Sequence, residues 1–219
     1  MTLCLVLVSL VAMAQVKQEY VNPKFYKLAQ KHEKVAVIPF ETQIGLRQKE
    51  REKFTEDQIR KMEAEEGISV QNGLTNWFLR KAGKKGMPIE FQDVTTTNAL
   101  LAKAGITAAN MKNYTPQEIA GILGVDAVMG GLFKTSKPMS EGASAALGAL
   151  VGFWGATNTG DITITLTNAA DGTTLWKYGR DLSGGLGSSV DSLIDYIMKK
   201  ASKKFPYFFM EKYEKDAKK

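Results

Sequence analysis

The feature that most constrains the fold is the run "KVAVIPFE" at residues 34–41. Its apolar residues are continuous rather than alternating, which is typical of a strand buried on both faces. Pro39 indicates where ladder pairing stops, because proline has no N–H to donate. A strand buried on both faces needs a covering layer on each side of its sheet. The run therefore favours an α/β layer structure.

Helix signals follow this strand. Thr55 and Gln58 have the spacing of a capping box, which predicts a long helix that reaches about residue 82. Gly67 lies midway and is expected to divide it. Residues 88–94 alternate as a half-exposed strand does, and residues 97–104 favour a short helix. The expected apolar face of the long helix comprises Ile59, Met62, Ile68, Val70, Leu74, Trp77 and Phe78.

A second helix start, Thr115-Pro116-Gln117-Glu118, combines a cap with proline at the first position, and Gly124 predicts the end of that helix. Residues 125–133 then predict a strand. Gly130 and Gly131 within it indicate a bulge or a close backbone approach.

The next segment predicts a β-hairpin. Ile162, Ile164 and Leu166 alternate with threonines, and a three-residue loop with a left-handed Gly172 places Ile164 opposite Tyr178 and Leu166 opposite Trp176. Residues 184–187 predict a glycine-rich link. The last helix ends before Pro206, and an aromatic and then charged helical tail follows. Its expected apolar face comprises Val190, Leu193, Ile194, Ile197 and Met198.

The first residues, "MTLCLVLVSLVAMAQ", resemble a secretory signal peptide that is cleaved after Ala14. The alternative is an apolar strand or helix of the mature fold. Cys4, the only cysteine, lies inside this run and would be lost on cleavage. We expect a signal peptide at 1–14, a helical lead-in at 15–33 that starts at Asn22 and Pro23, a single α/β domain with a mixed sheet at 34–205, and a charged tail at 206–219.

Few residues suggest chemistry. Lys and Arg total 29 against 23 Asp and Glu, and this basic excess fits solvated helix faces better than a nucleic-acid site, since no nucleic-acid-binding motif accompanies it. We interpret His32 as an exposed helix residue, and Glu63, Glu65 and Glu66 as salt-bridge residues. We interpret the segment "SGGLGSS" at 183–189 as a flexible link between the hairpin and the last helix rather than as an anion-binding site. We expect no catalytic residue, cofactor, metal or small-molecule substrate, and therefore no enzyme.

One stretch stands apart, because residues 142–160 carry no charge. A helix over 142–156 would be about 21 Å long, short of the roughly 30 Å hydrocarbon core of a bilayer. Three interpretations stay open: packing on the domain's own sheet, contact with another subunit or partner, and contact with a membrane. Ser144, Gly148, Gly152 and Ala156 would form a row of small residues. The proposed contact residues are Leu147, Gly148, Leu150, Val151, Gly152, Phe153 and Trp154.

Three segments resemble the curli-secretion-channel (CsgG-like) family and the TolB amino-terminal domain: "KVAVIPFE", "EIAGILGVDAVMGG" and "ITITLTNAADGTTLWKY". The resemblance covers about residues 34–204. It implies an exported protein of the cell envelope, periplasmic or outer-membrane-associated, that acts through protein contacts in assembly, transport or regulation. The alternative is an oligomeric secretion channel. The sequence departs from the family by lacking a usable lipobox cysteine and two amphipathic β-hairpins of the inserted kind.

Overall fold

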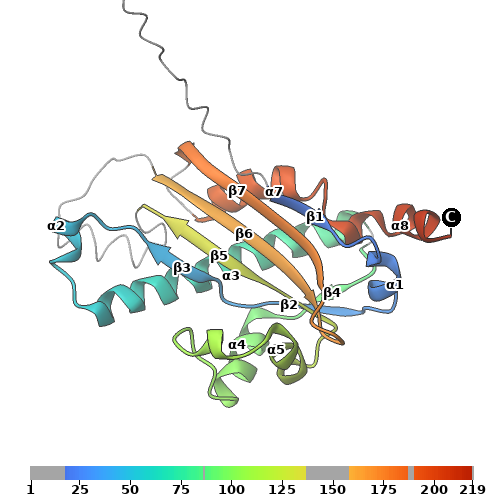
Figure 1. The fold of residues 1–219 in the computed structure, drawn as a ribbon, viewed down its shortest axis with the longest axis horizontal. Coiled ribbons are helices and arrows are strands. Elements are labelled where there is room, and N and C mark those ends of the chain that lie inside the picture. The colour runs from blue at the N-terminus through green and yellow to red at the C-terminus, as the bar shows by residue number, and fades with distance from the viewer. Residues whose placement is uncertain (1–17, 86, 137–157, 187–189, 219) are drawn as a thin grey trace, which may run out of the picture.

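A computed structural model describes residues 18–85, 87–136, 158–186 and 190–218 of this chain. These residues form one mixed sheet with the strand order β1-β7-β6-β5-β2-β4, and β3 also pairs with β5 (Figure 1). The α/β fold with a mixed sheet is thereby confirmed. The strands are β1 (Gln18–Val21), β2 (Lys34–Val37), β3 (Glu41–Ile44), β4 (Glu90–Phe91), β5 (Ala127–Thr135), β6 (Asn158–Asn168) and β7 (Thr174–Leu186).

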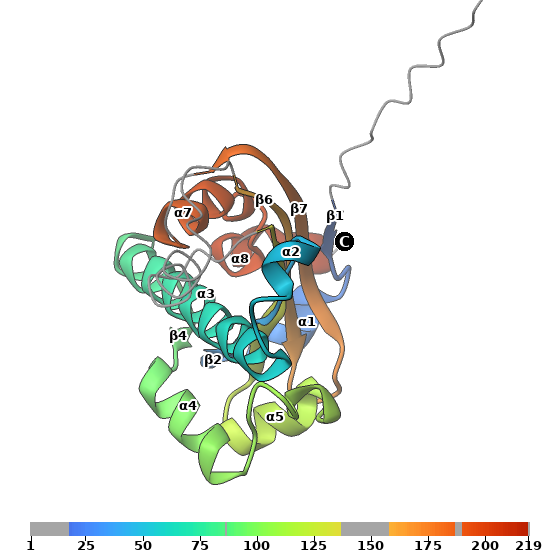
Figure 2. The same cartoon turned by 90° about the vertical axis from the view of Figure 1, so that its left-hand side faces the viewer.

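Helices cover the sheet unequally. The main core lies between one sheet face and α3, α7 and the C-terminal segment, and a smaller core lies on the other face under α4 and α5 (Figure 2). The helices are α1 (Phe25–Ala29), α2 (Gln48–Arg51), α3 (Glu56–Lys85), α4 (Val94–Lys103), α5 (Pro116–Leu123), α7 (Val190–Ala201) and α8 (Met210–Ala217), with 3-10 turns η1 (Met111–Asn113) and η2 (Pro206–Phe209).

Strand β2 is buried on both faces, as its continuous apolar run predicted. Val35 and Val37 belong to the main core, whereas Ala36 belongs to the core under α4 and α5. The strand lies parallel to both of its neighbours, β4 and β5. Pairing with β5 breaks near Pro39 and resumes as β3, which the sequence did not indicate because Ile44 is the only aliphatic residue of that strand.

Helix α3 begins at the predicted capping box. The Thr55 N–H donates to Gln58 Oε1 at 2.8 Å, and the Gln58 N–H donates to Thr55 Oγ1 at 3.2 Å. Gly67 does not divide the helix, which is continuous through it. A Cβ at Gly67 would lie 2.1 Å from the Phe40 carbonyl oxygen, so glycine lets the β2–β3 connection cross the helix closely. Ile68, predicted on the buried face, is 40% exposed.

The hairpin register is confirmed at its two aromatic positions, where Ile164 pairs with Tyr178 and Leu166 with Trp176. Gly172 is left-handed, with φ of 69°. The predicted three-residue loop is wrong, because the register shifts after Leu166 so that Thr167 faces Thr174. This bulge lets the consecutive residues Leu175 and Trp176 both enter the main core.

Both ends of the described chain depart from expectation. The lead-in expected to be helical starts with strand β1, which pairs antiparallel with β7, and α1 begins at Phe25 rather than Pro23. The expected tail at 206–219 is partly core, since Pro206 and Tyr207 are buried. The expected link at 184–187 is largely strand, because β7 runs to Leu186.

The remaining predicted elements are close to those observed. Thr115 and Glu118 form the expected capping box of α5, and Gly124 ends that helix in the left-handed conformation. The five predicted core residues of α7 are all buried. Within β5, Gly131 marks a close approach and not a bulge. A Cβ there would lie 1.8 Å from the Thr163 carbonyl oxygen, and the pairing with β6 shows no shift.

Candidate functional site

The predicted contact residues Leu147, Gly148, Leu150, Val151, Gly152, Phe153 and Trp154 lie outside the described residues. The strands on either side fix where this stretch joins the fold. Thr135 at the end of β5 faces Gly160 in β6, and it also faces Ile44 at the end of β3. The stretch therefore connects to the sheet at the end where β3 finishes.

A charged corner, residues 41–66, occupies this end of the sheet. It contains β3, α2 and the first turns of α3 (Figure 1). A small apolar cluster of its own, separate from the main core, holds it together: Ile44, Phe54, Ile59 and Met62.

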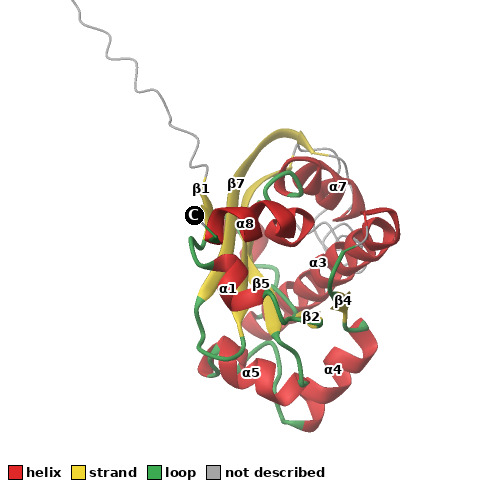
Figure 3. Ribbon diagram, turned by 90° about the vertical axis from the view of Figure 1, so that its right-hand side faces the viewer, coloured by secondary structure: helices red, strands yellow, loops and turns green. Residues whose placement is uncertain are grey.

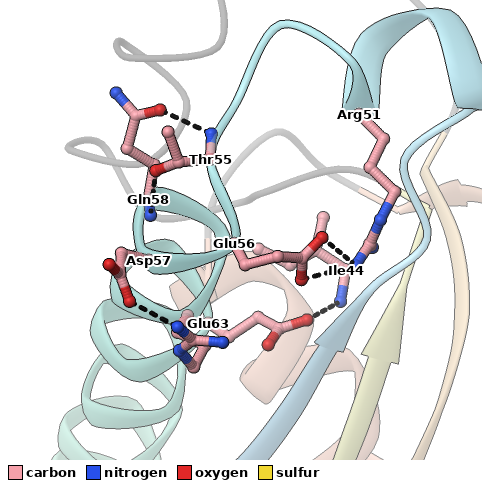
Figure 4. Close-up of polar contacts among 8 residues, drawn as sticks. Ile44, Arg51, Thr55, Glu56, Asp57, Gln58 and Glu63 are labelled. Carbon is pink, nitrogen blue, oxygen red and sulfur yellow. Dashed lines mark hydrogen bonds and ion pairs between the residues drawn. The ribbon is translucent and has the colours of Figure 1, made fainter.

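Ion pairs cover the charged corner (Figure 4). Arg51 Nη2 lies 2.9 Å from both carboxylate oxygens of Glu56, and their side chains are 47% and 62% exposed. Arg60 pairs with Asp57, and Arg47 pairs with Glu50. The hydrogen bond from Arg47 lowers the pKa of the Glu50 carboxyl. Since the Arg51–Glu56 pair is well exposed, its favourable charge interaction is largely screened by water.

Glu63 has a different role from the salt bridge predicted for it. Its Oε1 accepts a hydrogen bond at 3.0 Å from the backbone N–H of Ile44 (Figure 4). That N–H lies on strand β3, so the carboxylate occupies a backbone donor that an added strand would need. Glu66, also expected on a solvated face, is fully buried.

A hydrogen-bonded chain of four side chains lies at the opposite end of the sheet. The ring of His32 lies between two partners: Nδ1 is 2.6 Å from the Tyr207 hydroxyl, and Nε2 is 3.2 Å from Asn168 Oδ1. Asn168 Nδ2 in turn donates to Asp171 Oδ1 at 2.8 Å. We call His32, Tyr207, Asn168 and Asp171 the histidine relay. It joins the segment after α1, the hairpin and η2.

The hydrogen bonds specify the protonation state of His32. Because Asn168 donates through Nδ2 to a carboxylate, its Oδ1 is left to accept, so His32 Nε2 carries a proton. Nδ1 is then free to accept from the Tyr207 hydroxyl, which completes a chain running from tyrosine to aspartate. This arrangement suits the neutral ring. With a second proton on Nδ1, the Tyr207 hydroxyl could no longer donate to the ring and would have to accept instead.

Burial favours the same neutral state. Desolvation lowers the pKa of His32, and the nearby Asp126 carboxylate and the Asn168 hydrogen bond offset part of that shift. Burial also raises the pKa of the Tyr207 hydroxyl far above its ordinary value, so tyrosine stays a donor. His32 is therefore half-buried and connects segments that are distant in the sequence through hydrogen bonds. The expectation that it is an exposed helix residue is wrong.

Two polar side chains lie at the carboxyl end of β2, the kind of position where α/β folds often bind ligands. Gln71 and Asn98 exchange two hydrogen bonds, at 3.0 and 3.1 Å, and Gln71 also donates to the Val37 carbonyl. Within residues 18–85, 87–136, 158–186 and 190–218, no three acidic, histidine or cysteine residues gather as a metal site would need. No helix in the same ranges is long and apolar enough to cross a membrane.

The histidine relay was not predictable from sequence. His32 and Tyr207 are 175 positions apart, and neither lies in a motif. The only local signal was Asn168 just before the hairpin loop, where asparagine commonly bonds to nearby backbone.

Comparison with known proteins gives structural likeness alone. No family model and no curated protein matches this chain. Among solved structures, the PelC dodecamer from Paraburkholderia phytofirmans is 14% identical, with 89% of this chain and 96% of that chain covered and a TM-score of 0.40. The LpoB C-terminal domain from Salmonella enterica is 12% identical over 74% and 94%, with a TM-score of 0.38. Lipoprotein GNA1162 from Neisseria meningitidis is 12% identical over 78% and 98%, also with a TM-score of 0.38.

Proposed function

We propose that this chain is an exported, non-enzymatic protein of the cell envelope, periplasmic or outer-membrane-associated. In this proposal it binds another protein, or another copy of itself, in assembly, transport or regulation of an envelope complex. The signal-peptide pattern at 1–14 supports export, and the resemblance to the CsgG-like and TolB amino-terminal families supports an envelope role. Residues 142–160 supply the contact, with Leu147, Leu150, Val151, Phe153 and Trp154 as its bulky apolar side chains.

One observation supports this proposal: the described residues on either side of the uncharged stretch form a core among themselves. Phe133 in β5 and Ile162 and Ile164 in β6 flank that stretch in sequence, and they are buried in one cluster with residues of α3, α7 and the C-terminal segment. An apolar stretch of 19 residues with no charge is then best explained by a surface outside this domain's own core.

The test is to place a charge in the stretch. We expect Leu150→Asp and Trp154→Asp to leave the circular dichroism spectrum and thermal midpoint unchanged, while the oligomer or partner complex is lost in light scattering. Thr159→Asp, a polar position at the end of the same stretch, is the matched control and should retain binding. If Leu150→Asp and Trp154→Asp unfold the domain, the stretch is core and the proposal fails.

The resemblance to curli-secretion channels and the Gly148–Gly152 spacing, which is common between membrane helices, favour a second candidate: an oligomeric, membrane-associated transport component. Detergent-dependent rings and leakage of dye from liposomes would support it. A protein that neither binds nor permeabilises liposomes would eliminate it while leaving the contact proposal intact.

A further inference from the structure

The antiparallel part of the sheet has one face without a described helix over it. Along β6, Ile162 and Ile164 point to the main core and are at most 1% exposed. Thr163 and Thr165, which alternate with them, point to the other face and are only half-buried. The core under α4 and α5 takes only Ala36 and Val128 from the strands as buried members, so it does not extend across β6 and β7. We call this surface of β5, β6 and β7 the open face.

The strand register arranges the open face in three rows. Residues that face each other across paired strands point to the same side, and the rows follow at intervals of two residues. The first row is Gly130, Thr165 and Lys177; the second is Leu132, Thr163 and Gly179; the third is Lys134, Asp161 and Asp181.

Opposite charges stand at the two ends of the open face. The first row carries one positive charge, from Lys177. The third row carries one positive and two negative charges, from Lys134, Asp161 and Asp181, for a net charge of −1. The first and third rows are four residues, or about 13 Å, apart. Thr163 in the middle row is small and half-buried, whereas Gly179 in the same row is buried beside Gln18 of β1.

We propose that the open face binds a second copy of this chain, with the strands of the two copies antiparallel and a two-fold axis passing through the middle row. This axis places β7 over β7, so that Lys177 of each copy faces Asp181 of the other, with Asp161 next to it. Two identical contacts result, as a two-fold interface requires. Stacked sheets lie about 10 Å apart, a gap that a lysine and an aspartate side chain bridge together.

The same charges exclude the other simple two-fold arrangement. An axis along the strands, between β6 and β7, would place Asp161 of each copy over Asp181 of the other. Two carboxylates of each copy would then be brought together, and like charges that meet across an interface are unfavourable. The charge pattern thus selects one orientation.

The size of the open face predicts a weak, reversible dimer. The nine paired residues of β5 and their partners in β6 and β7 cover roughly 450 Å² per copy at the standard strand spacing and rise. Interfaces of this size are at the small end of the specific ones. The residues of this surface are distinct from the proposed contact residues at 147–154, so the inference goes beyond the function proposed above.

Charge reversal tests the dimer on the full chain, purified after its native processing, by sedimentation equilibrium at low salt up to about 0.5 mM. We expect Lys177→Glu and Asp181→Lys each to weaken self-association about tenfold or more. The double variant Lys177→Glu/Asp181→Lys should restore it, since each glutamate then faces a lysine. Lys199→Glu on the exposed side of α7 makes the same charge change away from the face and should have no effect.

Mixing provides a stricter test, because a mixture of the two single variants should associate although neither does alone. A wild-type chain that stays monomeric throughout the concentration range overturns the proposal. So does a dimer that both reversals leave unchanged. Leu150→Asp should not affect this dimer, so failure here and failure of the contact proposed for residues 142–160 are separable.

Discussion

The two ends of the sheet are stabilised by different means. At the charged corner, exposed ion pairs surround a cluster of four buried apolar side chains. At the histidine relay, neutral and half-buried hydrogen bonds lie against an aromatic group in which Phe25, Phe205 and Tyr207 make edge and tilted contacts. Figure 3 shows α1 and α8 together at the relay end.

This difference indicates which of the two ends contributes more to the stability of the domain. Surface ion pairs contribute little, because water and salt screen them and both side chains lose freedom. Buried rings and satisfied buried hydrogen bonds contribute more, and a broken one leaves an unpaired group. We therefore expect the relay end to be costly to change and the charged corner to be tolerant.

Removing the Tyr207 side chain should have the largest effect. Tyr207 is 2% exposed and contacts the rings of Phe25 and Phe205. We expect Tyr207→Ala to lower the free energy of unfolding by about 3–5 kcal/mol, in line with large-to-small core changes. Urea denaturation measures this. A loss below about 1 kcal/mol would show that the C-terminal segment is not part of the core.

Removing only the hydroxyl should isolate the relay. Tyr207→Phe keeps the ring contacts but leaves His32 Nδ1 without its donor, at an expected cost of about 1–2 kcal/mol. Tyr213→Phe is the matched control, since its ring also packs on Phe25 and its hydroxyl is outside the relay. Equal losses in the two variants would contradict a special role for the hydroxyl of Tyr207.

The pH dependence follows from the lowered pKa of His32. The unfolded chain, with its histidine near pKa 6.5, takes up a proton before the folded chain does. Stability is therefore complete above about pH 6.5 and falls as the pH drops from there through the folded pKa. The charged groups facing His32 are Asp126 and Asp171, and both moderate this effect.

The chain has one histidine, so urea midpoints between pH 7 and 5.5 report mainly on His32. The slope should disappear in His32→Gln. An equal slope in that variant, or a wild type that gains stability on acidification, would contradict the neutral relay.

The smallest effect is expected at the charged corner, for an ion pair whose two side chains are both exposed. Arg51→Ala should change the free energy of unfolding by less than about 0.5 kcal/mol, because the Arg51–Glu56 pair is largely in water. The measurement is thermal unfolding in low salt and in 0.5 M salt. If Arg51→Ala lowers the free energy of unfolding by more than about 1.5 kcal/mol in low salt but not in 0.5 M salt, ion pairs do stabilise the charged corner substantially.

The sequence predicted local features well. The capping boxes at Thr55 and Thr115 depend on residues three apart, and the register of Ile164 with Tyr178 depends on alternation and a nearby turn. Such interactions leave a pattern within a few residues. They are also why the α/β layers and the core face of α7 were predictable.

What the sequence did not reveal depends on contacts between distant residues. The four residues of β1 have no strand pattern of their own. They form a strand because they pair with the edge strand β7. Glu66 was assigned to solvent because charged residues surround it in sequence, although the fold buries it. The histidine relay has the same origin, since its members come together only in the folded chain. The predicted contact residues at 147–154 lie outside the described residues, and their role remains a proposal.

The pairing of β1 with β7 also fixes an order of events. Gln18 faces Gly179, so the first strand of the described chain pairs with the last one. During synthesis from the N-terminus, residues 18–21 cannot pair with β7 until more than 150 further residues have followed. The edge of the sheet and the His32–Tyr207 bond are thus closed late. Such distant pairings slow folding, which makes the emerging N-terminal strand the part of this chain that most needs protection on its way.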